Sequence, residues 1–193
     1  MPDHRRASGH VTRPISPYHA PGFYDQALAQ GRHRDIVGGR WEETGLVQMQ
    51  LLLAAGLDPQ HRLLDIGAGS LRLGCRAVPY LHPNHYWATD LSGALMRRGY
   101  DAELADKTRL SPDHLIEDAN FDLPHIPDTI THAIAFAVFT HLPLTHLAQA
   151  LPHIRAHGEG GAIINTASMA GHMSPPGMEA YSASKFAVVA LTE

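Results

Sequence analysis

The segment from Leu63 to Asp90 constrains the fold of this chain more than any other part of the sequence. It opens with the short apolar run LLDI and passes directly into the turn Gly67-Ala68-Gly69. A second run, HYWATD at 85–90, again reads as a strand and ends on an acidic residue. Strand, glycine turn, helical segment and strand in this order predict a crossover unit, in which the two strands lie parallel in one sheet.

Three further segments have the composition of strands: HLIEDANF at 114–121, ITHAIAFAVF at 130–139 and GGAIINTAS at 160–168. Strands that alternate with helical segments are typical of an α/β fold with a doubly wound, mostly parallel, Rossmann-like sheet. Residues 1–20 lack any periodicity and predict a mobile tail, so residues 21–193 are expected to form a single domain. In such sheets ligands bind beyond the carboxyl ends of the strands.

Two helical segments have apolar residues at helical spacing. The first, at 44–55, has Leu46, Met49 and Leu53 in this pattern, and Leu51–Leu53 are expected to pack in the core. The second, at 143–157, places Leu144, Leu147 and Leu151 on one face, before a proline that should kink or split the helix. A last helix is predicted from about residue 178 to the end of the chain.

Composition excludes several classes of function. Fifteen Lys and Arg against nineteen Asp and Glu give a net charge of −4, which does not suit a nucleic-acid-binding surface. No apolar run is long enough for a membrane span, and the amino terminus has no signal-peptide core. The single cysteine fits a reducing cytoplasm, and the histidines lack the cysteine or carboxylate partners of a zinc site. We therefore expect a cytoplasmic protein that binds no metal, membrane or nucleic acid.

The glycine turn and the acid after the second strand carry the first candidate site. Gly67 and Gly69 allow a tight turn and the close approach of a ligand. Asp90, 25 positions after Asp65, lies where a carboxylate usually accepts hydrogen bonds from the two ribose hydroxyls of an adenosine. The next glycine is Gly74, so the G-x-G-x-x-G pattern of dinucleotide sites is broken and an adenosine ligand without phosphates fits better. The alternative is that both glycines serve only a tight connection.

The segment LLDIGAGSLRLG at 63–74 resembles motif I of the class I S-adenosylmethionine (SAM)-dependent methyltransferases, in the subgroup with Ser-Leu-Arg after the glycines. The resemblance includes IVGGRWEETG at 36–45 and AIAFAVFTHLP at 133–143, and it covers residues 22–157. It implies that SAM is the cofactor and a small molecule the substrate. It also implies that Gly67 and Gly69 lie behind the methionine end of SAM and that Asp65 helps to hold its amino group.

The same resemblance places Asp90 at the ribose of SAM and Asp118 beside the adenine. It also places Phe139, Thr140 and His141 around the transferable methyl group. Methyl transfer depends mainly on aligning the nucleophile with the S–CH₃ bond. His141 is a candidate base for a nucleophile that must lose a proton, although a histidine that ends a strand is more often structural.

A second set of chemically competent residues lies in the last thirty positions. Ser168 precedes Tyr181 by 13 positions, and Tyr181 and Lys185 share one helical face at i, i+4. A nearby ammonium lowers the pKa of a phenol, so Tyr181 can exchange a proton with an alcohol or carbonyl while Ser168 orients it. The segment at 160–193 resembles the active-site segment of the short-chain dehydrogenases/reductases, which implies NAD(P) as cofactor and Lys185 at the nicotinamide ribose.

The two resemblances meet at HGEGG, residues 157–161, where both families have a Gly-Gly before the fifth strand of a sheet ordered 3-2-1-4-5. We interpret the chain as a chimera truncated after the fifth strand and its following helix. The dinucleotide loop, the N-N-A-G motif and the helical asparagine of the dehydrogenases have no counterpart in this sequence. The fifth strand would lie at the edge of the sheet, where unpaired backbone groups favour self-association.

Three hypotheses follow. The first is a SAM-binding, methyltransferase-like protein that acts on a small molecule, although the truncation counts against activity. The second is an NAD(P)-dependent oxidoreductase that uses Ser168, Tyr181 and Lys185. The third is a chimeric fold without catalysis.

Overall fold

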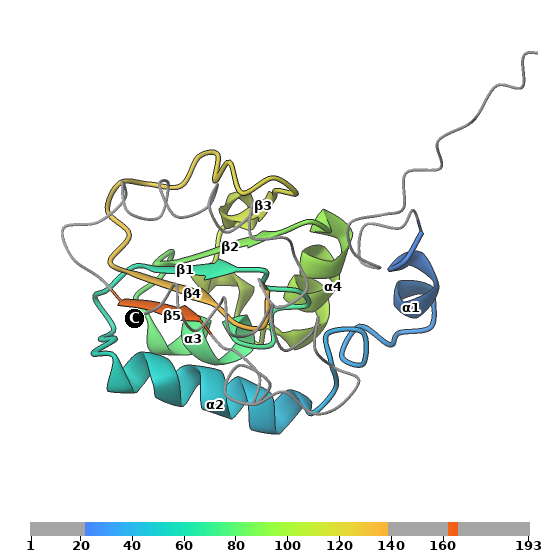
Figure 1. The fold of residues 1–193 in the computed structure, drawn as a ribbon, viewed down its shortest axis with the longest axis horizontal. Helices are drawn as coiled ribbons and strands as arrows, with labels where there is room; N and C mark the ends of the chain where they lie inside the picture. The colour runs from blue at the N-terminus through green and yellow to red at the C-terminus, as the bar shows by residue number, and fades with distance from the viewer. Residues whose placement is uncertain (1–21, 139–161, 166–193) are drawn as a thin grey trace, which may run out of the picture.

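A five-stranded parallel sheet forms the centre of the computed structural model, which describes residues 22–138 and 162–165 (Figure 1). Its strands are β1 (Leu63–Ile66), β2 (Tyr86–Asp90), β3 (Leu115–Glu117), β4 (His132–Ala135) and β5 (Ala162–Asn165). They lie in the order β3-β2-β1-β4-β5, and every neighbouring pair is parallel. The predicted doubly wound sheet and its strand order are confirmed.

Two helices precede the first strand, and two follow β1 and β2 as the crossover rule requires. They are α1 (Asp25–Ala29), α2 (Trp41–Ala54), α3 (Gly74–Tyr80) and α4 (Gly93–Glu103), with short 3₁₀ turns η2 (Lys107–Arg109) and η3 (Pro112–His114). Ser92 precedes α4 and its hydroxyl accepts the backbone amide of Leu95, which explains why the helix begins there. Figure 1 shows α2 and α3 below the sheet and α4 beside it.

Two clusters of buried side chains cover the two faces of the sheet. The first joins residues of α2, α3 and α4 to Leu63, Ala88 and Ile134 of the strands. The second packs the loop at 121–130 against strand residues such as Leu64, Ile66 and Ala133. All four residues of β1 are buried, as expected for a central strand that is covered on both sides.

The buried face of α2 differs from the predicted one. Met49 and Leu52 are buried, but Leu46, Leu51 and Leu53 are 48%, 36% and 44% exposed. The prediction that Leu51 and Leu53 lie in the core is therefore wrong. The helix is apolar on nearly all sides, so the sequence pattern does not mark which face packs against α3. That face includes Gly45, where a Cβ would lie 2.8 Å from Nε of Arg76.

Several predicted elements lie outside the described residues: the tail at 1–20, the helix at 143–157 with Leu144, Leu147 and Leu151, and the last helix from residue 178. Within the described part of the chain, no helix combines the length and the apolar character needed to cross a membrane. The same part contains no group of three or more His, Cys, Asp or Glu side chains that could hold a metal ion.

Candidate functional site

A cavity of about 240 Å³ opens at the edge of the sheet where the parallel strands end. Segments that follow four strands form much of its wall: 67–69 after β1, 89–91 at the end of β2, 118–119 after β3 and 136–138 after β4. The amino-terminal part of the chain contributes Tyr24, residues 36–38 and Gln48. The cavity thus lies where the sequence predicts a ligand site, and it contains Gly67, Gly69, Asp90 and Asp118 of the predicted set.

The turn after β1 requires glycine at both predicted positions. Gly67 has φ +72° and Gly69 has φ +57°, which side chains rarely adopt. A Cβ on Gly67 would collide with the side chain of Val138, and one on Gly69 would lie 2.7 Å from Cγ1 of Val37. Both valines line the cavity, so side chains of the cavity wall fill the space beside each glycine.

Asp90 holds this turn against the end of β2. Its Oδ2 accepts the backbone amide of Gly69 at 2.8 Å, and its Oδ1 accepts that of Ser92 at 3.0 Å. Burial raises the pKa of Asp90, and the amides of Ser92, Gly69 and Leu91 oppose that shift. The two oxygens of a carboxylate have about four lone-pair sites, so Asp90 keeps acceptor capacity for a ligand hydroxyl beside these amides.

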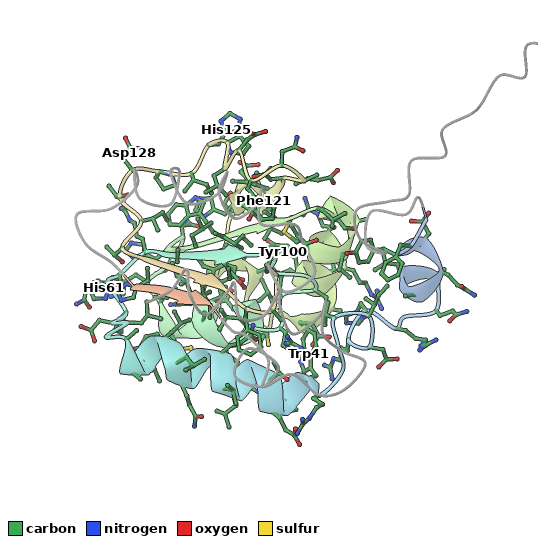
Figure 2. The ribbon with its side chains drawn as sticks, viewed as in Figure 1. Trp41, His61, Tyr100, Phe121, His125 and Asp128 are labelled. Atoms are coloured by element: carbon green, nitrogen blue, oxygen red, sulfur yellow. The ribbon has the colours of Figure 1, made fainter. Side chains whose placement is uncertain are left out.

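Asp118 organises the loop that follows β3. Its Oδ1 accepts the amides of Asn120 at 2.9 Å and Asp122 at 3.3 Å, and its Oδ2 accepts that of Leu123 at 2.8 Å. This loop carries Phe121, which lines the cavity. Figure 2 shows Phe121 above the sheet and Trp41 below it, at the beginning of α2. Asp118 therefore positions one aromatic side of the cavity.

Asp65 does not line the cavity. Its neighbours in the sheet are Ala88 and Ile134, which both belong to the core cluster under α2, α3 and α4. Its Oδ2 accepts the hydroxyl of Tyr86 at 2.7 Å. Burial raises the pKa of Asp65 to about 7, although the hydrogen bond from Tyr86 opposes this. The carboxyl group thus faces the core of the protein.

The segment 33–39, which we call the strap, contributes residues 36–38 to the cavity wall. The sequence motifs did not predict that this segment lies at the site. The hydroxyl of Ser70 donates to the carbonyl of His33 at 2.8 Å. Nη1 of Arg72 donates to the carbonyls of Val37 at 3.0 Å and Gly39 at 3.2 Å. The Ser-Leu-Arg after the glycines is the sequence feature that could have indicated this contact. Ser70 and Arg72 from this segment donate to backbone carbonyls of the strap.

A buried carboxylate anchors the other end of the strap. Glu103, at the end of α4, pairs with Nε2 of His33 at 2.6 Å and with Nη2 of Arg34 at 2.6 Å. The Arg34 guanidinium, and next the His33 ring, lower the pKa of Glu103. Trp41 is 8% exposed and packs beneath Arg34, whose guanidinium lies 5.1 Å from the ring centroid.

The remaining predicted site residues lie outside the described part of the chain: Phe139, Thr140, His141, Ser168, Tyr181 and Lys185. Their predicted roles are not tested by the structure. Strand β5, which precedes Ser168, pairs with β4 so that Ala135 and Asn165 are neighbours at the carboxyl ends of both strands.

A family model described as "short chain dehydrogenase" matches residues 127–193, less than half of the chain. The match begins upstream of the predicted junction at 157–161 and includes β4. No curated protein matches the chain significantly.

Several solved structures with a similar fold are described as methyltransferases. A putative O-methyltransferase from Nostoc punctiforme PCC 73102 has a TM-score of 0.60 and 17% identity, over 92% of this chain and 51% of the other. Magnesium protoporphyrin IX methyltransferase from Synechocystis PCC 6803, solved with bound SAM, has a TM-score of 0.51 and 16% identity, over 70% of this chain and 69% of the other. A glycopeptide N-methyltransferase in complex with sinefungin has a TM-score of 0.51 and 17% identity, over 66% and 56%.

These likenesses show the fold: the chain has the Rossmann-like α/β fold of these methyltransferases. It spans between about half and two thirds of their length. The chain therefore combines a methyltransferase-like fold with a carboxyl-terminal part that matches the short-chain dehydrogenase model, as its two sequence resemblances predict.

Proposed function

We propose that the chain binds S-adenosylmethionine in the cavity at the carboxyl ends of β1–β4 and is a methyltransferase-like protein for a small molecule. The observation that carries the proposal is the convergence of the glycine turn, Asp90 and Asp118 on one cavity of a fold shared with SAM-bound methyltransferases.

The chemistry of the cavity wall fits an adenosine. Leu91, Leu95, Phe121 and Phe136 provide apolar surface for a flat base. The carboxylate of Asp90 stands beside this surface and can accept the ribose hydroxyls with its remaining lone pairs. Asp118 follows β3, so its side of the cavity is the one we assign to the adenine.

Bound SAM supplies an electrophilic methyl group, so the protein has mainly to bind it, hold the acceptor in line and exclude water. We assign the adenosine to Asp90 and Asp118 and the methionine end to the glycine turn. Phe139, Thr140 and His141 follow the cavity segment 136–138 directly in the chain, and we assign them to the acceptor side. His141 would accept the proton of a hydroxyl or amine nucleophile.

The match of residues 127–193 to the dehydrogenase model favours a second candidate function. An NAD(P)-dependent oxidoreductase would use Ser168, Tyr181 and Lys185 and would place the pyrophosphate at the turn after β1. That turn has Arg72 where the dinucleotide pattern has its third glycine. We therefore rank this function second.

Titration calorimetry of the full chain separates the two functions, with SAM, NADH and NADPH as ligands in separate experiments. We expect saturable binding of SAM and none of either dinucleotide. Replacing Asp90 by Ala removes the acceptor of the ribose hydroxyls and should weaken SAM binding about tenfold or more, since hydrogen bonds to charged groups are strong.

Asp101→Ala is the matched control, because it removes an exposed aspartate of α4 that does not line the cavity. Its affinity for SAM should equal that of the wild type. Saturable binding of NADH or NADPH without binding of SAM would establish the second function instead.

A further inference from the structure

The strap is attached to the rest of the described structure mainly by polar contacts. Of its residues only His33 is buried, and Ile36 and Val37 are half-buried at the cavity. Among the described residues, its backbone–backbone hydrogen bonds stay within 32–39 and none joins it to the sheet. A segment with few buried apolar contacts and no pairing to the sheet belongs to the parts of a protein that open most readily.

Two glycines form the end of the strap that is nearer to α2. Gly38 has φ +95° and Gly39 has φ +60°. A Cβ at either position would meet no described atom within 4 Å, so packing does not require glycine there. The requirement is conformational, and such a pair of residues can absorb the change in φ and ψ of a hinge.

Glu103 is the last residue of α4, a position at which the helix dipole disfavours a negative charge. Its side chain is nevertheless only 7% exposed. Nε and Nη2 of Arg34 donate to its two oxygens at 2.8 and 2.6 Å, and His33 pairs with one of them. The helix therefore gives no local reason for this carboxylate, whereas its contacts with the strap do.

His33 also carries a feature that opposes the attachment. Its Nε2 lies 2.6 Å from Oε1 of Glu103, but its Nδ1 is buried and has no hydrogen-bond partner. An unpaired buried nitrogen disfavours this position of the strap, because Nδ1 would meet water if the strap moved outward. One side of the ring is thus held and the other favours release, as in an element with two accessible positions.

We propose that the strap is a lid over the glycine-turn side of the cavity and that Glu103, with His33 and Arg34, is its latch. Val37 of the strap packs against Gly69, so a ligand at the glycine turn lies under this segment. Glu103 is then a positioning residue, which sets how fast SAM enters and leaves the cavity. The lid is a property of the free protein, and only the identity of its ligand rests on the proposed function.

The fluorescence of Trp41 reports on the latch without any ligand. Trp41 is 8% exposed, its ring centroid lies 6.3 Å from that of His33, and Arg34 covers its face. The chain has two tryptophans, so Trp87→Phe leaves Trp41 as the single emitter. In this background Glu103→Ala should raise the open population about tenfold, the effect of losing a hydrogen bond to a charged group, and increase quenching of Trp41 by acrylamide. Glu103→Gln keeps an acceptor for His33 and should give an intermediate increase.

Stopped-flow binding of SAM to the full chain separates a lid from a general weakening of the cavity. A latch holds the strap in both the free and the bound protein, so its loss should raise the association and the dissociation rates by the same factor. We expect a rise of about tenfold in both rates of Glu103→Ala, with a dissociation constant within about twofold of the wild type. Damage to the cavity would raise the dissociation rate alone and weaken binding.

Glu43→Ala is the matched control, because Glu43 pairs with Arg40 next to the strap and both side chains are exposed. It should keep the quenching and both rates of the wild type. If Glu103→Ala does not fold, Arg34→Gln removes the half-exposed partner and leaves the contact of His33 with Glu103. Both SAM rates should then rise together by a smaller factor.

Wild-type quenching and wild-type rates in Glu103→Ala would overturn the latch and leave the proposed function intact. Weaker binding of SAM at an unchanged association rate would also overturn it, because Glu103 would then support the cavity and not a lid. If the wild type does not bind SAM, the proposed function is wrong, and the quenching of Trp41 in the free protein still decides whether the strap is latched.

Discussion

Asp65 and Asp90 lie on neighbouring strands of one sheet, and the structure gives them opposite surroundings. Asp65 is the third residue of β1, and its side chain enters the core, where Tyr86 is its partner. Asp90 is the last residue of β2, and its carboxylate turns to the cavity edge and accepts backbone amides of the glycine turn and of Ser92. The comparison shows that position along the strand decides whether an aspartate can meet a ligand, because only the carboxyl edge is open.

The largest expected consequence concerns stability and pH. Burial raises the pKa of Asp65 from 3.8 to about 7, so the folded state binds more protons than the unfolded state between these values. The free energy of unfolding should therefore fall as the pH rises from about 4 to 7, by about 4 kcal/mol from this group, and level off above. Asp65→Asn removes this group, so urea unfolding across this range should show a correspondingly smaller fall.

Asp101→Asn, which changes an exposed aspartate, is the control for that experiment and should leave the pH profile unchanged. A profile of Asp65→Asn that parallels the wild type would show that Asp65 has an ordinary pKa and does not belong to the core.

The second prediction removes the partner of Asp65. Tyr86→Phe deletes the hydroxyl that donates to the buried carboxyl group. The loss of stability should be larger above pH 7, where the group is ionised, and reach about 2 kcal/mol, because hydrogen bonds to charged groups are the strong ones. Thermal unfolding at pH 5 and pH 8 measures the difference.

Tyr80→Phe is a matched control, since its hydroxyl donates at 2.9 Å to the carbonyl of Leu57, which does not titrate. It should lose the same stability at both pH values. A loss in Tyr86→Phe that is equally independent of pH would contradict the pairing with an ionising Asp65.

Much of the fold could be predicted because its determinants are local. Each strand is a short run of apolar residues that is followed by turn or cap residues, and the order of the sheet follows from the crossover rule and the two resemblances. The buried face of α2 could not be predicted, because Leu51, Leu52 and Leu53 are equally apolar and only packing against α3 selects Leu52.

The part of the candidate site that could be predicted consists of residues at or just after the ends of strands. Gly67, Gly69, Asp90 and Asp118 line the cavity because the carboxyl ends of parallel strands meet at one edge. The strap was missed because contacts such as those of Arg72 with Val37 join residues that are far apart in the sequence. The family resemblance implies that Asp65 belongs to the site. Its side chain points into the core instead, because the pleat of β1 and the hydrogen bond from Tyr86 set its direction.

The smallest predicted effect concerns Asp118, which lies at the same edge as Asp90 and binds the amides of its own loop. Asp118→Ala should lower the free energy of unfolding by about 1 kcal/mol, as the loss of a capping carboxylate does, and weaken SAM binding less than Asp90→Ala does. Asp106→Ala removes a comparable cap, at the amide of Thr108, and neither residue lines the cavity. The Asp106→Ala variant should bind SAM with the affinity of the wild type. If it loses as much affinity for SAM as Asp118→Ala does, the role of Asp118 is contradicted.

The most direct test of the account is a crystal structure of the full chain grown with equimolar S-adenosylhomocysteine, the demethylated product of SAM, and NADH. We predict density for the nucleoside in the cavity, with its ribose at Asp90. Density for nicotinamide adenine dinucleotide along Gly67, Gly69 and Asp90 would contradict the account, as would a nucleoside bound elsewhere.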